Sequence, residues 1–205
     1  MKERPILFSD AMVRAILDGR KTQTRRVFFI RGADGKKHAI TSQNEEIVEI
    51  GGTFHYLSTA AMSGPYPCPY GQPGDRLWVR EAFMHLDNRD GGRHIKYRAG
   101  GPDFVFRVGF GDDDWRGDLK WTPSIHMRRE YSRILIEITK VRVERLQDIN
   151  EQDAEKEGAE PIGAINKGPF RVGFYVLWDR INEARGYGWD KNPWVWVIEF
   201  RRIEP

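Results

Sequence analysis

A basic and hydroxyl-rich segment contains the first candidate functional groups of this sequence. Gly19 to Arg26 reads GRKTQTRR, which combines four basic side chains with three hydroxyl or amide side chains. Side chains of these types, close together in sequence, are candidates for proton transfer or for binding. The same composition is also typical of a solvated turn that leads into two arginines on a strand face.

Glu81 is the second candidate, at the end of the segment Gly74 to Glu81, GDRLWVRE. Residues 75–84 are predicted to form a strand, and its period of two places Glu81 on the face of three apolar residues, Leu77, Val79 and Phe83. A carboxylate among apolar groups is costly unless it is paired or functional. A structural pair with an arginine is the alternative interpretation.

Trp121, Ser124 and His126 form a third candidate cluster. An aromatic ring beside a proline turn can stack on a base, and hydroxyl or imidazole groups can contact the polar edge of that base. A tryptophan ahead of a strand is also typical of a protein core. We expect these three residues, with Arg26 and Arg80, to contact substrate.

The pattern along the chain predicts an α+β, mostly β protein. Glycine-rich and proline-rich stretches in residues 31–72 suggest a β-rich insertion within a single domain covering 1–205. Because the helices do not alternate regularly with the strands, a small, mostly antiparallel barrel with flanking helices is favoured over a doubly wound sheet. The expected helices are 10–18, 150–158 and 170–184, and the expected strands are 5–8, 22–30, 46–50, 53–57, 75–84, 94–98, 104–108, 132–145 and 194–201.

Composition narrows the function class further. The 205 residues are 40% apolar and 31% charged, as in a soluble globular protein, and no apolar run approaches the ~18 residues of a membrane span. The absence of an export signal and the single Cys68, expected to be inert, predict a cytoplasmic protein without disulfides. Glycine-rich phosphate loops, dinucleotide fingerprints and zinc-type Cys/His clusters are lacking, so neither metal nor cofactor is predicted.

Charge gives weaker information about partners. The excess of 33 basic over 30 acidic residues does not by itself indicate nucleic acid. Arginine pairs recur near aromatic residues, however, at Arg25-Arg26, Arg128-Arg129 and Arg201-Arg202.

Two motifs together resemble the ASCH family of PUA-like proteins. Gly19-x-Lys21-x-x-Thr24-x-Arg26 is similar to the family pattern G-x-K-x-x-E-x-R, with Thr24 in place of the usual glutamate. Gly74 to Glu81 is similar to the G-D-x-L-W-V-R-E of phage-type and bacterial members. The opening segment 5–8 and the segments 121–127, 141–149 and 194–200 resemble the longer, prophage-associated members. The resemblance implies a PUA-like β-barrel.

Threonine at position 24 resembles the ASCH branch that hydrolyses N(4)-acetylcytidine. That resemblance implies a catalytic set of Lys21, Thr24 and Glu81. Thr24 would attack the acyl carbon, a neutral Lys21 would accept its proton, and Glu81 would protonate or hold the leaving amine. Because Lys21 and Thr24 are three residues apart, they would face opposite sides of one continuous strand, so a bend near Thr22 is expected.

The sequence therefore predicts a metal-free amidohydrolase that acts on an acylated pyrimidine nucleoside. A non-catalytic RNA-binding module and an ASCH-type ribonuclease are the alternatives. In each case the expected partner is a nucleoside or RNA, with no membrane involved.

Overall fold

The protein has an α+β fold made mostly of strands. The computed structural model describes residues 1–32, 34–58, 62–87, 93–100, 120–162 and 168–203. The expected strand 104–108 lies outside these residues. Within them, no helix is long and apolar enough to span a membrane.

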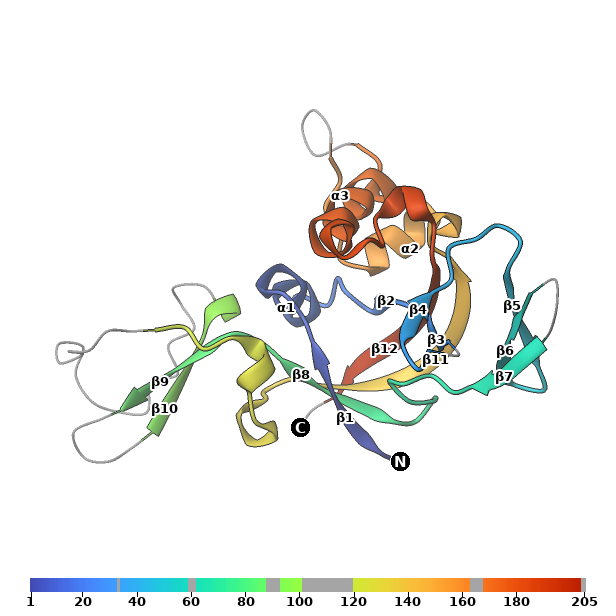
Figure 1. The fold of residues 1–205 in the computed structure, drawn as a ribbon. Coiled ribbons are helices and arrows are strands. Elements are labelled where there is room, and N and C mark those ends of the chain that lie inside the picture. The colour runs from blue at the N-terminus through green and yellow to red at the C-terminus, as the bar shows by residue number, and fades with distance from the viewer. Residues whose placement is uncertain (33, 59–61, 88–92, 101–119, 163–167, 204–205) are drawn as a thin grey trace.

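A five-stranded sheet forms the centre of the fold (Figure 1). Its strands in spatial order are β1 (Glu3–Leu7), β8 (Arg76–Arg80), β11 (Leu135–Arg145), β12 (Trp194–Ile203) and β2 (Gln23–Val27). β1 and β8 run parallel and the other neighbours are antiparallel. Among the described residues the two edge strands, β1 and β2, do not pair, so this sheet is open and the closed barrel stays a prediction.

In the described residues three α-helices lie beside this sheet. They are α1 (Asp10–Leu17), α2 (Glu151–Lys156) and α3 (Phe170–Asn182), where apolar spacing predicts α1 and α3 and the start and stop residues predict α2. Val13 and Ile16 of α1 are buried at helical spacing, as are Phe174 and Trp178 of α3. Asn150 caps α2 by accepting a hydrogen bond from the main-chain N–H of Asp153. Figure 1 shows α2 and α3 together, above the strands β2 and β12.

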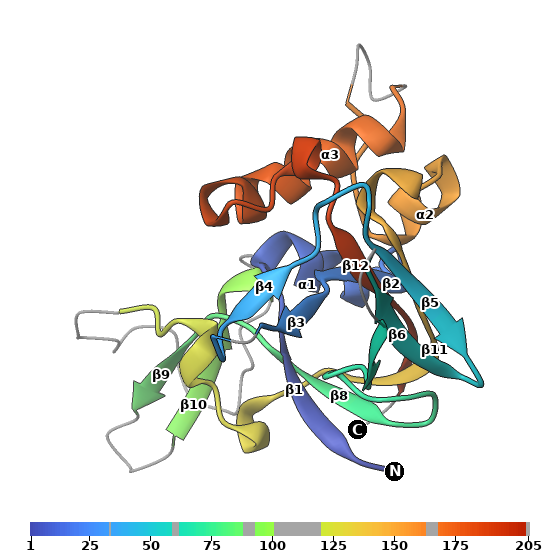
Figure 2. The ribbon, with the colours of Figure 1, turned by 45° about the vertical axis from the view of Figure 1, so that its right-hand side comes forward.

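The shorter strands form separate small sheets. β3 (Phe29–Arg31) pairs with β4 (Lys37–Ala39), and β5 (Glu46–Ile50), β6 (Thr53–Leu57) and β7 (Met62–Tyr66) pair in that order. β9 (Phe83–Asp87) and β10 (Arg93–Tyr97) form a hairpin that Figure 2 shows on the side away from β5 and β6. The 3₁₀ turns within the described residues are Arg98–Gly100, Ser124–His126, Arg129–Tyr131, Leu146–Asp148, Glu183–Arg185 and Trp189–Lys191.

Two of the predicted strands were wrong as continuous elements. The expected strand 22–30 is divided at Phe28, because β2 pairs with β12 whereas β3 pairs with β4. The expected strand 75–84 is divided at Glu81 and Ala82, because β8 pairs within the main sheet and β9 pairs with β10. Each break falls where the chain changes pairing partner.

The apolar core has two parts. The larger cluster joins the main sheet to α1 and includes Ile6, Ile136 and Trp196, and Phe54 of β6 packs edge-on against Trp196 with ring centres 5.0 Å apart. The smaller cluster lies between the sheet and α2 and α3, and it includes Trp178. The small sheet β5–β7 therefore contributes side chains to the main core.

Gly173→Ala is expected to lower the free energy of unfolding. A Cβ atom at Gly173 would lie 1.9 Å from the carbonyl oxygen of Glu160, so α3 would have to move away from that segment. Overpacking of this kind costs about 1–3 kcal/mol, although alanine is favoured over glycine by about 1 kcal/mol in an unhindered helix. Urea titration followed by circular dichroism measures the change.

Val176→Ala is the matched control, because Val176 is 38% exposed on the same helix. Its effect should stay within about 0.5 kcal/mol. Equal stability of Gly173→Ala and the unmodified protein would contradict the close approach of α3 to Glu160.

Candidate functional site

Lys21 lies in the loop between α1 and β2, and its ammonium group is fully enclosed. Nζ donates to the main-chain carbonyl of Gln23 at 2.7 Å, to the main-chain carbonyl of Glu157 at 2.7 Å and to Glu157 Oε2 at 2.8 Å. A lysine ammonium has three donors, so every donor has an acceptor. The carboxylate that pairs with Lys21 is therefore that of Glu157, which the sequence analysis did not single out.

The local backbone brings Lys21 and Glu157 together. Gly19, with φ of 74°, ends α1, and the main-chain N–H of Lys21 then donates to the Ala15 carbonyl at 2.9 Å. Gly158 has φ of 75°, and a Cβ atom there would lie 3.1 Å from the Cβ of Lys21. Glycine after α2 thus permits both the left-handed turn and the close approach. β2 begins only at Gln23, so Lys21 and Thr22 precede the strand, and the expected bend near Thr22 stays a prediction.

Lys21 and Glu157 belong to a larger buried ion network. The Arg25 guanidinium donates to Glu157 Oε1 at 3.2 Å, to Asp153 at 3.1 Å and to Glu144. Arg142 extends the network by binding Asp153 and Glu144. These contacts connect β2 with β11 and α2, so the charged groups fix the position of the segment that carries Thr24.

Burial and the ion pair act on the Lys21 pKa in opposite directions. Burial lowers the pKa, the Glu157 carboxylate raises it, and the nearby Arg26 and Arg25 lower it further, so that it falls below its ordinary value. A lowered pKa favours the neutral Lys21 that the catalytic set requires. The carboxylate that opposes this shift is Glu157.

Thr24 lies in β2 opposite Ile198 of β12, and it is 2% exposed. Among the described residues its hydroxyl has no hydrogen-bond partner. Thr24 and Arg26 share one face of β2. The Phe8 ring lies 5.6 Å from Lys21 Nζ and 5.2 Å from the Arg26 guanidinium, so both cations gather around one aromatic ring.

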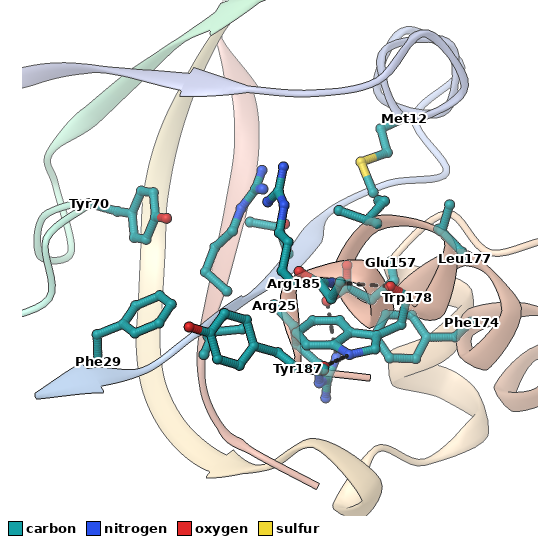
Figure 3. Close-up of a pocket in the computed structure, with 15 residues that line it drawn as sticks. Met12, Arg25, Phe29, Tyr70, Glu157, Phe174, Leu177, Trp178, Arg185 and Tyr187 are labelled. Carbon is teal, nitrogen blue, oxygen red and sulfur yellow. Dashed lines mark hydrogen bonds and ion pairs between the residues drawn. The ribbon is translucent and has the colours of Figure 1, made fainter. Parts of the chain in front are cut away.

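Thr24 lines a cavity of about 170 Å³ between β2 and α3 (Figure 3). Figure 3 shows Tyr70 and Phe29 on one side of it and Trp178 on the other. Arg26 and Glu157 also line the cavity, whereas neither Lys21 nor Glu81 is among the described lining residues. The full set is Met12, Thr24, Arg25, Arg26, Val27, Phe29, Tyr70, Glu157, Phe174, Leu177, Trp178, Ile181, Asn182, Arg185 and Tyr187.

Glu81 is buried, as predicted, in the break between β8 and β9. Its side chain is 1% exposed, and Arg133 donates to both of its oxygens at 2.9 Å. Burial raises the pKa of Glu81, with a smaller opposing effect of Arg133 and a further increase from Asp10. The two-bond geometry with Arg133 is that of an ionised carboxylate.

The other predicted contacts gather near Glu81. The Arg80 guanidinium lies 4.7 Å from the Trp78 ring and donates to the Ile125 carbonyl at 3.2 Å. Ser124 and His126 flank Ile125 in a 3₁₀ turn, where His126 is exposed. Trp121 precedes Thr122, whose main-chain N–H donates to the Phe83 carbonyl. None of these residues is among the described residues that line the cavity.

The most consequential residues that sequence reasoning missed are Glu157 and Arg185. Glu157 directly precedes Gly158, which was expected to end a helix, but no motif marked the glutamate as the partner of Lys21. Arg185 lies after α3, more than 150 positions from Thr24. The aromatic residues Phe29, Tyr70 and Tyr187 are likewise brought to the cavity only by the fold.

The described residues contain no group of three or more His, Cys, Asp or Glu side chains arranged to hold a metal ion. Burial raises the pKa of the Cys68 thiol, which disfavours the reactive thiolate. No family model, no curated protein and no solved structure matches this chain.

Lys21→Met is expected to destabilise the protein by about 3–5 kcal/mol, because it leaves the Glu157 carboxylate buried without its ammonium partner. Adding Glu157→Gln should recover part of that loss. Chemical denaturation of the two single variants and the double variant gives the coupling energy.

Arg20→Met serves as the control, because the Arg20 side chain is 45% exposed and, in the described part of the chain, its ion pair is with the exposed Asp18. Its effect should be within about 0.5 kcal/mol. Strictly additive losses for Lys21→Met and Glu157→Gln would show that the pair does not couple the two segments.

Proposed function

We propose that this protein is a hydrolase that cleaves the acyl amide of an acylated pyrimidine nucleoside such as N(4)-acetylcytidine. The observation that carries the proposal is the Thr24 hydroxyl, which has no partner among the described residues and lines a cavity walled by aromatic rings. Aromatic faces suit a pyrimidine ring. The resemblance of Gly19 to Arg26 to the ASCH pattern supports the same substrate, and with it a PUA-like fold for the central sheet.

The reaction divides into two acyl transfers. Thr24 Oγ1 attacks the acyl carbon while neutral Lys21 Nζ accepts the hydroxyl proton. The C–N bond then breaks, and the same proton passes from Lys21 to the departing amine, which leaves as cytidine. Water, activated in turn by Lys21, hydrolyses the ester on Thr24 and releases the acid. Lys21 alternates between base and acid, so the scheme needs no second proton donor.

Glu157 acts as a positioning residue in this scheme. It accepts from Lys21 through both its carboxylate and its main-chain carbonyl, which keeps Nζ on the side of Phe8 where Arg26 also lies. Arg133 donates to both oxygens of Glu81, so Glu81 would have to leave this ion pair to protonate the leaving amine. Its role as the acid for the leaving amine stays a prediction.

Binding of a nucleoside or RNA without chemistry is the second candidate. One observation favours it: the three donors of Lys21 and both oxygens of Glu81 are already engaged, as in structural ion pairs. The same cavity would then hold the base without turnover. No contact among the described residues supports the ribonuclease alternative.

Thr24→Ala should reduce the turnover of N(4)-acetylcytidine on the order of 10³-fold or more, because it removes the nucleophile. Thr24→Ser should keep measurable turnover, since it keeps the hydroxyl. Chromatographic detection of cytidine after incubation with purified protein measures both.

Thr22→Ala is the matched control, because Thr22 is exposed two positions earlier and its main-chain N–H bond to Lys156 survives the change. It should keep normal turnover. Unchanged turnover in Thr24→Ala would refute the nucleophile. Cytidine binding without any release from N(4)-acetylcytidine in the unmodified protein would favour the binding module.

The pH dependence of kcat/KM should show a limb that rises with pH, because Lys21 must lose its proton to act as a base. Burial lowers the Lys21 pKa, so the midpoint should fall below the ordinary lysine value of about 10.4. Glu157 raises that pKa, so Glu157→Gln should move the rising limb to lower pH. A limb that is unmoved, or that moves to higher pH in folded Glu157→Gln protein, would contradict the assignment of Lys21 as the base.

A further inference from the structure

Two arginines from distant parts of the chain line the cavity beside Thr24. Arg26 belongs to β2, and Arg185 is the last residue of the 3₁₀ turn Glu183–Arg185. Gly186, with φ of 84°, follows Arg185 and reverses the chain so that Tyr187 also reaches the cavity. Figure 3 shows Arg185 between the Tyr70 side and the Trp178 side of this space.

Neither arginine has a carboxylate partner among the described residues. Arg26 donates to the Leu7 main-chain carbonyl at 2.6 Å, and its Nε is buried without an acceptor. Arg185 makes no ion pair or side-chain hydrogen bond with the described part of the chain. The adjacent Arg25, by contrast, binds the carboxylates of Glu144, Asp153 and Glu157. Arg25 is thus held in direct ion pairs, whereas Arg26 and Arg185 make none with the described residues.

The two charges influence one another across the cavity. Burial lowers the pKa of Arg26, the Tyr70 and Glu157 side chains raise it, and Arg185 lowers it again. Two guanidinium groups that repel one another in a partly buried place favour an anion between them. Guanidinium forks match the oxygens of a phosphate group, to which they donate paired hydrogen bonds.

The aromatic wall defines what such an anion would be attached to. Phe29 and Tyr187 pack edge to face with ring centres 5.4 Å apart, and Tyr70 lies on the same side of the cavity. A volume of about 170 Å³ is smaller than the ~300–1,000 Å³ of a typical ligand pocket, which suits one pyrimidine ring and not a whole nucleotide. The sugar and phosphate would then lie at the mouth, where Arg185 is exposed.

We propose that Arg26 and Arg185 form a subsite for a phosphate ester on the pyrimidine nucleoside, so that the preferred ligand is a phosphorylated nucleotide or an RNA end and not the free nucleoside. This inference rests on the proposed function only in taking the base of the ligand to be a pyrimidine. The phosphate subsite is defined by the two arginines themselves.

Calorimetric titration of the full chain with cytidine, cytidine monophosphates and orthophosphate tests the proposal. A monophosphate is expected to bind on the order of 10-fold or more tightly than cytidine, since charge-assisted hydrogen bonds are strong. Arg185→Gln should reduce this preference to less than about 2-fold and leave cytidine affinity unchanged. The preference should also weaken between low and high salt. Cytidine oligonucleotides with and without a 5′ phosphate distinguish an RNA end from a free nucleotide.

Arg180→Gln is the matched control, because Arg180 is an exposed residue of α3 that does not line the cavity. It should keep the full preference. Equal affinity for cytidine and its monophosphates, or equal losses in Arg180→Gln and Arg185→Gln, would overturn the subsite. If the protein prefers monophosphates but does not hydrolyse N(4)-acetylcytidine, the phosphate subsite is supported and the proposed hydrolase function is refuted. If it hydrolyses N(4)-acetylcytidine but shows no preference for monophosphates, the hydrolase function is supported and the subsite is refuted.

Discussion

The buried ion pair between Lys21 and Glu157 is the constraint on which the rest of the site depends. Desolvating an ammonium and a carboxylate costs several kcal/mol for each ion, which is recovered only when the geometry is good and further hydrogen bonds are made. Here Lys21 Nζ has three acceptors, and Arg25 binds the second oxygen of Glu157. The pair joins the loop after α1 to the end of α2, two segments that are distant in sequence.

The Lys21–Glu157 ion pair, by holding the end of α2 against the loop before β2, determines which side chains surround Thr24. With α2 fixed against β2, α3 packs over the same strand and supplies Trp178 to the cavity wall. Charge is distributed unevenly around this point. The described carboxylates in this region pair directly with Lys21, Arg25 and Arg142, whereas Arg26 and Arg185 line the cavity without a direct ion pair among the described residues. The resulting site combines a free hydroxyl, aromatic faces and positive charge.

Much of the fold follows from local sequence patterns. Local strand-like stretches predicted β5, β6, β11 and β12 to within a few residues, and Gly19 and Gly158 marked the ends of α1 and α2. The breaks at Phe28 and Glu81 were missed, because both segments keep a strand-like pattern while they change pairing partner. Pairing partners are a property of the whole chain, and local periodicity does not encode them.

The site was predictable to a smaller extent. The period-two pattern placed Glu81 on an apolar face, and Glu81 is buried; Lys21 and Thr24 were recognised as candidates from their spacing, and both are buried as well. Their partners were not predictable, because Glu157, Arg133 and Arg185 are 52 or more positions away from the residues with which they act and belong to no recognisable motif. Sequence therefore indicated which groups could react but not which groups hold them in place.

The central claim is that Thr24 becomes acylated by a nucleoside substrate within the cavity. Mass spectrometry of peptides from protein quenched during incubation with N(4)-acetylcytidine tests it most directly. The account predicts one acetyl group on the peptide that contains Thr24, and its absence from the Thr24→Ala variant. Release of cytidine while that peptide stays unmodified at every quench time would contradict the account.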